Sequence, residues 1–148
     1  MIKLAGKLQT VRSFAFLNAP FLKYMVLPKS VETFEDHAFT GANLDSLYVP
    51  SNLKNFTGYA FESCEVGRFV GESIVQGDGR FIVVEDTLKA VSTIQEKELI
   101  VPESIRVIGS NAIWSVNPNV TRLTIEEGVE VIEPYAFSGC KALEEVYL

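Results

Sequence analysis

The sequence predicts a solenoid of short β-strands, and three observations lead to this fold class. Apolar or small residues recur at eight fixed positions of a unit that is 22 to 24 residues long. Most units open with an alternation of apolar and polar residues, as expected for a strand with one buried face. Most units close with an Ala-Phe pair. A fixed period of this length is typical of proteins in which each coil buries its apolar face against the next.

The unit from 120 to 142 defines the eight positions. They are held by Val120, Leu123, Ile125, Val129, Ile132, Ala136, Phe137 and Cys140. The unit from 44 to 65 repeats them with Leu44, Leu47, Val49, Leu53, Phe56, Ala60, Phe61 and Cys64. In three units proline directly follows the strand-like alternation, at Pro28, Pro50 and Pro102. Because proline lacks an amide donor, it ends the strand and turns the chain.

Taken in order, the chain is expected to form one solenoid domain over residues 1–148. Its expected units are 1–21, 22–43, 44–65, an irregular unit 66–95, 96–119, 120–142 and a partial unit 143–148. The irregular unit holds two strand-like runs, 81–84 and 88–91, separated by the turn residues Glu85, Asp86 and Thr87. This pattern predicts that a β-hairpin replaces part of one coil.

Both ends of the chain cut a unit open, since Met1 lies next to a strand and Leu148 ends one. Repeat proteins usually carry polar capping units that cover the apolar ends of the stack. We therefore expect either a piece of a longer protein or self-association through the open repeat ends.

The composition excludes several classes of protein. A hydrophobic content of 47% is too high for a disordered chain. No apolar run approaches the roughly 20 residues that a membrane span needs. The first residues, MIKLAGKLQTV, contain no visible signal peptide, because no apolar block with a cleavage site follows the lysine. A net charge of −6 argues against a nucleic-acid partner, which would require clustered Lys and Arg.

The two cysteines occupy the same position of their units. Cys64 and Cys140 fill a position that elsewhere holds Ala or Val, so a small apolar residue is all that the position requires. Coils repeat about every 4.8 Å, which separates the two cysteines by more than the roughly 7 Å between Cα atoms that a disulfide tolerates. We predict that both are core fillers.

No residue set in the sequence predicts catalysis or metal binding. The only histidine, His37, occupies a position that varies between units, and no oriented nucleophile accompanies it. The spacing of His37 and the cysteines does not match a metal site. The acidic pairs Glu126-Glu127 and Glu144-Glu145 fall in solvent-facing positions, where charge keeps a repeat protein soluble. We therefore expect no catalytic residues, no metal and no cofactor.

The outward side of the long strands is the predicted binding face. At the positions that alternate with the buried ones, the strands carry Tyr24, Tyr48, Ile100, Arg122 and Tyr147. Tyr and Arg are favoured anchors in protein recognition. The alternative is that Tyr and Ile stand there only because they form strands well. The sequence leaves both interpretations open for each single residue.

At the level of LxxLxIPxxVxxIxxxAFxxC, the chain resembles the BspA-like leucine-rich repeats of the Treponema pallidum type. The segment IEEGVEVIEPYAFSGCKALEEVYL, residues 125–148, carries the resemblance most clearly. The resemblance implies a right-handed leucine-rich-repeat solenoid with a parallel sheet on its concave face. It also implies a bacterial protein at the cell surface or secreted, in some members an adhesin. The chain departs from the pattern at Ile113-Trp114, where an Ala-Phe pair with a following polar residue would be expected.

These observations favour a non-enzymatic binding module. The expected ligand is a protein or a glycan, and adhesion at a bacterial surface is the role that the resemblance implies. The alternative is a structural spacer or assembly module within a longer repeat protein, with no ligand of its own. The identity of a ligand cannot be read from the repeat, because the repeat specifies the scaffold rather than the site.

Overall fold

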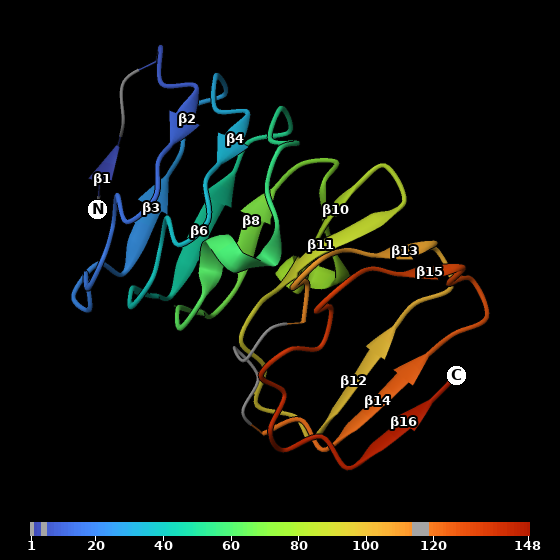
Figure 1. Ribbon diagram of the computed structural model, residues 1–148. Coiled ribbons are helices and arrows are strands. Elements are labelled where there is room, and N and C mark those ends of the chain that lie inside the picture. Colours follow the sequence, from blue (N-terminus) through green and yellow to red (C-terminus); the bar gives the residue numbers. More distant parts are fainter. Residues whose placement is uncertain (1, 4–5, 114–118) are drawn as a thin grey trace.

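The computed structural model describes residues 2–3, 6–113 and 119–148 of the chain. Trp114 lies outside the described residues. Figure 1 shows a stack of coils that runs from the N-terminus at one end to the C-terminus at the other. The described residues form short strands and two short 3₁₀ helices, so the predicted mostly-β solenoid is confirmed.

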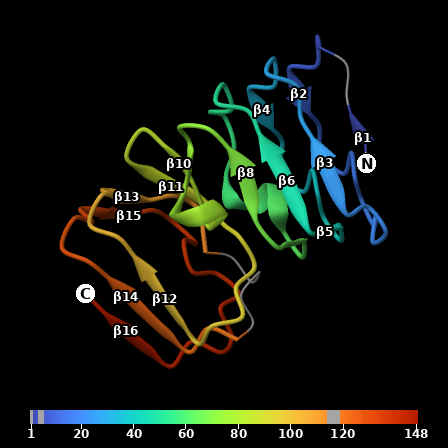
Figure 2. The ribbon, with the colours of Figure 1, turned by 180° about the vertical axis from the view of Figure 1, so that it is seen from behind.

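The long strands of successive coils pair in parallel, but they form two sheets rather than the single sheet that was expected. The first sheet consists of β1 (Ile2–Lys3), β3 (Tyr24–Val26), β6 (Ser46–Val49) and β8 (Phe69–Gly71). The second consists of β12 (Glu98–Val101), β14 (Arg122–Ile125) and β16 (Glu145–Tyr147). Figure 2 shows the two groups of strands from behind, with a gap in the ladder between β8 and β12.

Further strands line the rest of the coils. Near the N-terminus β2 (Thr10–Val11) pairs with β4 (Thr33–Phe34), and β5 (Asn43–Leu44) pairs with β7 (Glu65–Val66). A five-stranded sheet follows, in the order β15 (Val131–Ile132), β13 (Val107–Ile108), β11 (Thr87–Val91), β10 (Phe81–Val84) and β9 (Val75–Gln76).

The break in the ladder of long strands is caused by the irregular unit. The predicted hairpin is confirmed, with β10 and β11 antiparallel and joined at Glu85 and Asp86. After β8 the chain leaves the coil through β9 and the 3₁₀ helix η2 (Gly77–Gly79) before it enters the hairpin. β11 then rejoins the solenoid, because Leu88 pairs in parallel with Ile108.

Residues 66–95, which the structure describes throughout, contribute no turn at the opposite edge of the coil. As a result, the turn of the preceding unit, the 3₁₀ helix η1 (Gly58–Phe61), lies directly against the turn of the unit after it. The amide of Gly58 donates a hydrogen bond of 3.1 Å to the carbonyl of Ser110. A Cβ atom at Gly58 would lie 1.8 Å from the carbonyl oxygen of Asn111, so only glycine permits this approach.

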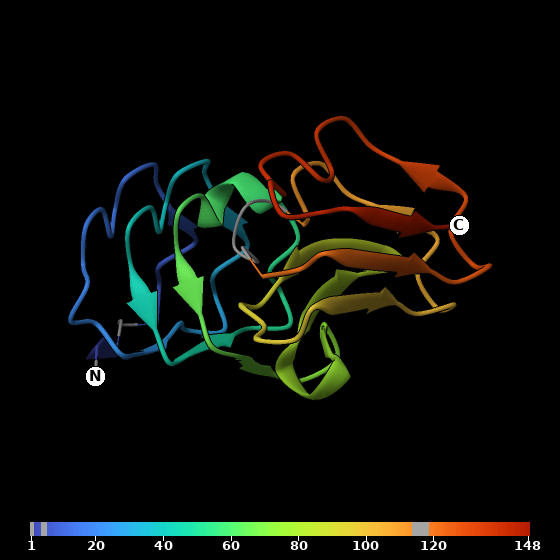
Figure 3. The ribbon, with the colours of Figure 1, turned by 90° about the horizontal axis from the view of Figure 1, so that it is seen from below.

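The hairpin also separates two apolar cores. The first core extends from Val11 to Ala90 in sequence and the second from Phe81 to Ala136. Side chains of β10 alternate between them, because Phe81 and Val83 belong to the second core and Ile82 to the first. Figure 3 shows the hairpin between the two blocks of coils.

Stacked aromatic rings fill the first core at the Ala-Phe position. The ring of Phe39 lies 5.4 Å from that of Phe16 and 5.3 Å from that of Phe61, with the planes nearly parallel. Phe34 meets Phe39 edge-on at 5.1 Å. In the second core Ile113 and the partly buried Phe137 occupy this position, and no ring stack joins the residues of that core that the structure describes.

The cysteines occupy apolar surroundings, as predicted for core fillers. Cys64 is buried in the first core, and Cys140 packs against the second. Burial raises the pKa of Cys64 to about 12 and that of Cys140 to about 11.

Candidate functional site

The outward face of the second long-strand sheet carries two rows of side chains in register. Glu98, Arg122 and Glu145 form one row across β12, β14 and β16. Ile100, Thr124 and Tyr147 form the next row. Their inward neighbours, such as Leu99 and Leu123, are buried, so the alternation of the strands turns these six side chains outward.

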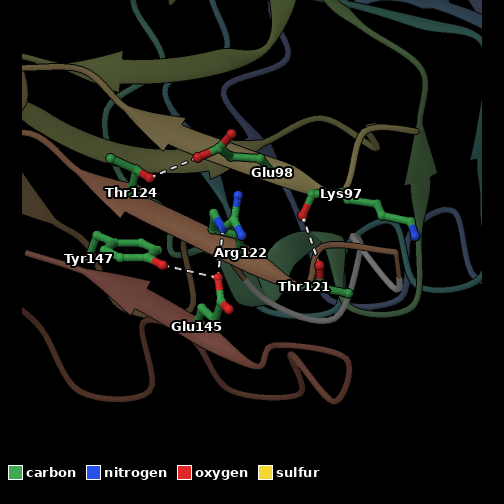
Figure 4. A network of polar contacts seen from close by, with 7 residues as sticks. All are labelled: Lys97, Glu98, Thr121, Arg122, Thr124, Glu145 and Tyr147. Atoms are coloured by element: carbon green, nitrogen blue, oxygen red, sulfur yellow. Dashed lines mark hydrogen bonds and ion pairs between the residues drawn. The ribbon is translucent and has the colours of Figure 1, made fainter.

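Hydrogen bonds fix the polar members of the two rows to each other (Figure 4). The Nε atom of Arg122 donates to Oε2 of Glu145 at 2.7 Å, and the Tyr147 hydroxyl donates to the same oxygen at 3.2 Å. The Thr124 hydroxyl donates to Oε1 of Glu98 at 3.0 Å. The guanidinium carbon of Arg122 lies 5.8 Å from the centre of the Tyr147 ring.

This network fixes the charges of the face. The hydrogen bond to Glu145 raises the pKa of Arg122, and the charge of Glu145 adds to that effect. The hydrogen bond from Arg122 lowers the pKa of Glu145, with a further contribution from the Tyr147 hydroxyl. Both groups stay ionised at neutral pH and hold one another in place. A side chain that is already ordered loses less conformational entropy when a ligand binds.

The other predicted site residues, Tyr24 and Tyr48, lie on the first sheet. Tyr24 on β3 is 52% exposed, whereas Tyr48 on β6 is only partly exposed. Tyr24 is in register with Ser46, and Tyr48 is in register with Val26 and Val70. The structure therefore brings Ile100, Arg122 and Tyr147 together on one sheet and places the two N-terminal tyrosines on another.

A notch of about 570 Å³ lies in the region where the ladder of long strands is broken. Its lining comes from the two residues before β8, from η2, from the start of β10 and from the segment that leads into β12, and it includes the predicted site residue Ile100. Arg80 and Glu96 form an ion pair of 3.0 Å on its wall. Arg68 lines the notch as well, and no ion pair joins its guanidinium to another described residue. The notch is therefore polar, with Ile100 at its junction with the second sheet.

Sequence reasoning missed the notch. The signal that locates it is the excursion from the period at Gly71 to Glu96, since a coil that leaves the stack opens a gap beside the next strand. The sequence did not indicate which residues would line that gap, because the lining depends on how the hairpin pairs with distant coils.

The described residues offer no other chemistry at this face. Among them no group of three His, Cys, Asp or Glu side chains lies close enough to hold a metal ion. Within the same residues no helix is long and apolar enough to cross a membrane. His37, which sequence reasoning placed at a variable surface position, lies away from the strand face, with Nδ1 at 2.7 Å from Oε2 of Glu62.

Comparison with known proteins identifies the repeat. The model of the BspA type leucine rich repeat region matches residues 1–73 and 89–148 in six copies. The unmatched residues, 74–88, hold β9, η2, β10 and the start of β11, which are the elements that leave the regular coil. No match was found among curated proteins.

Two solved structures share the fold. A leucine rich cell surface protein from Faecalibacterium prausnitzii A2-165 superposes with a TM-score of 0.73 and 21% identity over 95% of this chain. A leucine-rich repeat protein from Eubacterium ventriosum ATCC 27560 superposes with a TM-score of 0.58 and 12% identity over 92% of this chain. The chain spans 39% of the first protein and 44% of the second, so it corresponds to a part of each.

Proposed function

Because the chain belongs to the BspA-type leucine-rich repeat family, we propose that it is a non-enzymatic binding module whose second long-strand sheet recognises a protein ligand. The observation that carries the proposal is the ordered pair of rows on β12, β14 and β16. A Tyr, an Arg and an Ile stand there on a rigid sheet, beside a notch that can accept a protruding side chain. Rigid aromatic and Arg anchors next to a pocket are typical of the energetic centre of an interface.

The cell surface is the location that we propose for the protein. The Faecalibacterium neighbour is described as a cell surface protein, and the family resemblance points the same way. Adhesion or host interaction at that surface is part of this proposal.

Photo-crosslinking tests the proposed function. A photoreactive phenylalanine analogue at Ile100 should crosslink a discrete protein when the chain is exposed to surface proteins of cells that share its environment. The same analogue at Lys54, an exposed residue far from the second sheet, is the matched control. Arg122→Ala should weaken binding of the captured protein about tenfold, because it removes an anchor and leaves Glu145 without its ion-pair partner. Thermal stability should stay nearly unchanged, because exposed ion pairs contribute little to folding.

A spacer or assembly module is the second candidate, and one observation favours it. The last coil exposes apolar side chains, with Ile132 at 45% and Leu148 at 88%. Either a further coil or a second copy of the chain, packed on this coil, would cover them. If no protein crosslinks at Ile100, and if the chain dimerises in sedimentation equilibrium but Leu148→Asp does not, the assembly role replaces the binding role.

A further inference from the structure

A column of side chains runs along the turn edge of the solenoid, away from the long strands. It is formed by the residue that precedes the Ala-Phe or Ala-Ile pair of each coil: Phe14, His37, Tyr59, Asn111 and Tyr135. The rings of Phe14 and His37 stack at 5.1 Å with an angle of 5° between planes. Those of His37 and Tyr59 meet edge-on at 4.7 Å. Sequence reasoning treated this position as variable surface.

The backbone at this position explains part of the column but not its aromatic residues. Phe14, His37, Asn111 and Tyr135 have φ between 56° and 64°, the left-handed region. Asn and His tolerate that region better than most side chains, whereas Phe and Tyr are rarely found in it. The turn therefore accounts for Asn111 but gives no reason for the ring of Tyr135.

The missing turn of the irregular unit converts part of the column into a cleft. Because η1 lies directly against Ser110 and Asn111, Tyr59 and Asn111 are successive members of the column. The close contact between Gly58 and the backbone of Ser110 and Asn111 joins their two coils. A cavity of about 390 Å³ opens at this place, lined by Asp36, Thr57, Tyr59, Asn111, Tyr135 and Ser138. Its volume lies within the range of about 300–1,000 Å³ typical of small-molecule sites.

Asn111 is the polar centre of the cleft. The residue is only 8% exposed, and no described residue is hydrogen-bonded to its side-chain amide. The amide atoms are not among the side-chain polar atoms that are sealed from solvent, so they face the cleft. They are therefore free to donate to and accept from a ligand with both kinds of group.

We propose that this turn-edge cleft binds a neutral saccharide. The Tyr135 ring is 74% exposed and provides a flat surface, whose negative face attracts the C–H groups of a sugar ring. Asn111, Asp36 and the Ser138 hydroxyl supply the mixture of donors and acceptors that sugar hydroxyls require. Asp36 and the net charge of −6 disfavour an acidic sugar. The proposal is independent of the protein ligand proposed for the strand face.

Saturation-transfer difference NMR tests the proposal with defined probes. Cellotetraose, mannotetraose and β-1,4-galactotetraose represent neutral saccharides, and tetragalacturonic acid represents acidic ones. We expect saturation transfer to at least one neutral probe and none to the acidic probe. Tyr135→Asn removes the ring with a residue that accepts the left-handed backbone, and it should lower the association constant roughly fivefold. Asn111→Gly removes the side-chain amide with a residue that also adopts the left-handed backbone. It should abolish saturation transfer to the neutral probes.

Phe14→Asn is the matched control, because Phe14 occupies the same position of its coil but does not line the cleft. It should leave binding unchanged. The proposal fails if none of the neutral probes receives saturation. It also fails if Phe14→Asn weakens binding as much as Tyr135→Asn does, since the cleft would then not be the site.

Discussion

Burial determines the chemistry of single residues in this solenoid, and the two thiols illustrate it. Cys64 is surrounded by the first core, and desolvation is the first cause of its raised pKa, followed by the charge of Glu65. Desolvation alone raises the pKa of the less buried Cys140. Both thiols therefore stay protonated at pH values where a free cysteine is already largely ionised.

The raised pKa of Cys64 predicts a pH dependence of stability. In the unfolded chain the thiol ionises near pH 9, whereas in the folded chain it stays neutral up to about pH 12. Stability is therefore fully present below pH 9 and falls as pH rises between 9 and 12. Urea unfolding at pH 8 and pH 10.5 should show up to about 2 kcal/mol more loss in the wild type than in Cys64→Ala. Equal losses in the two proteins would show that the thiol is accessible to water in the folded state.

The residue scale also shows where sequence reasoning ends. The repeat period identified Ile100, Arg122 and Tyr147 as outward, because alternation along a strand is a local property. It did not reveal that Arg122 and Tyr147 would share Oε2 of Glu145, since that depends on the register between neighbouring strands. The unpartnered amide of Asn111 was out of reach for the same reason, because its surroundings come from coils distant in sequence.

At the scale of elements, the Ala-Phe position differs between the two halves of the stack. In the first half Phe39 is fully buried between Phe16 and Phe61. In the second half Phe137 occupies the same position of its unit but is only partly buried. The Ala-Phe pair is therefore expected to contribute more to folding stability in the first half than in the second. The repeat period alone did not predict this difference.

Alanine substitutions should reveal this difference. Phe39→Ala should lower the free energy of unfolding by about 3–5 kcal/mol, because it leaves a cavity in a stack of rings. Phe137→Ala should cost clearly less, because its environment is partly open to water and can relax. Urea denaturation of both variants, with the m-value monitored, measures the two losses. Equal losses would mean that the ring stack contributes nothing beyond ordinary burial.

The irregular unit is the element that sequence reasoning only partly predicted. The turn residues and strand-like runs predicted the hairpin, because a hairpin is formed by neighbouring residues. The pairing of Leu88 with Ile108 was not predicted, since it joins the hairpin to another coil. That pairing, together with the missing turn, produces both the divided sheet and the turn-edge cleft.

Considered as a whole, the molecule consists of two stacks that share one wall. β10 sends Phe81 and Val83 into the second core and Ile82 into the first. Among the described strands, none pairs β8 of the first long-strand sheet with β12 of the second. In repeat proteins each unit is stabilised by its neighbours, so cooperativity depends on the interfaces between units. The hairpin is the interface that couples the two halves, and the notch beside Ile100 follows from its geometry.

Coupling through β10 predicts that two adjacent residues act on opposite halves of the molecule. Ile82→Ala should lower hydrogen-exchange protection first in β3, β4 and β6, by about 2–5 kcal/mol, because it opens a cavity in the first core. Val83→Ala should lower it first in β12, β13 and β14, which surround the second core. The wild type should unfold in a single thermal transition, because the hairpin belongs to both cores. If both variants weaken both halves equally, β10 does not separate two cores and the stack behaves as one continuous array.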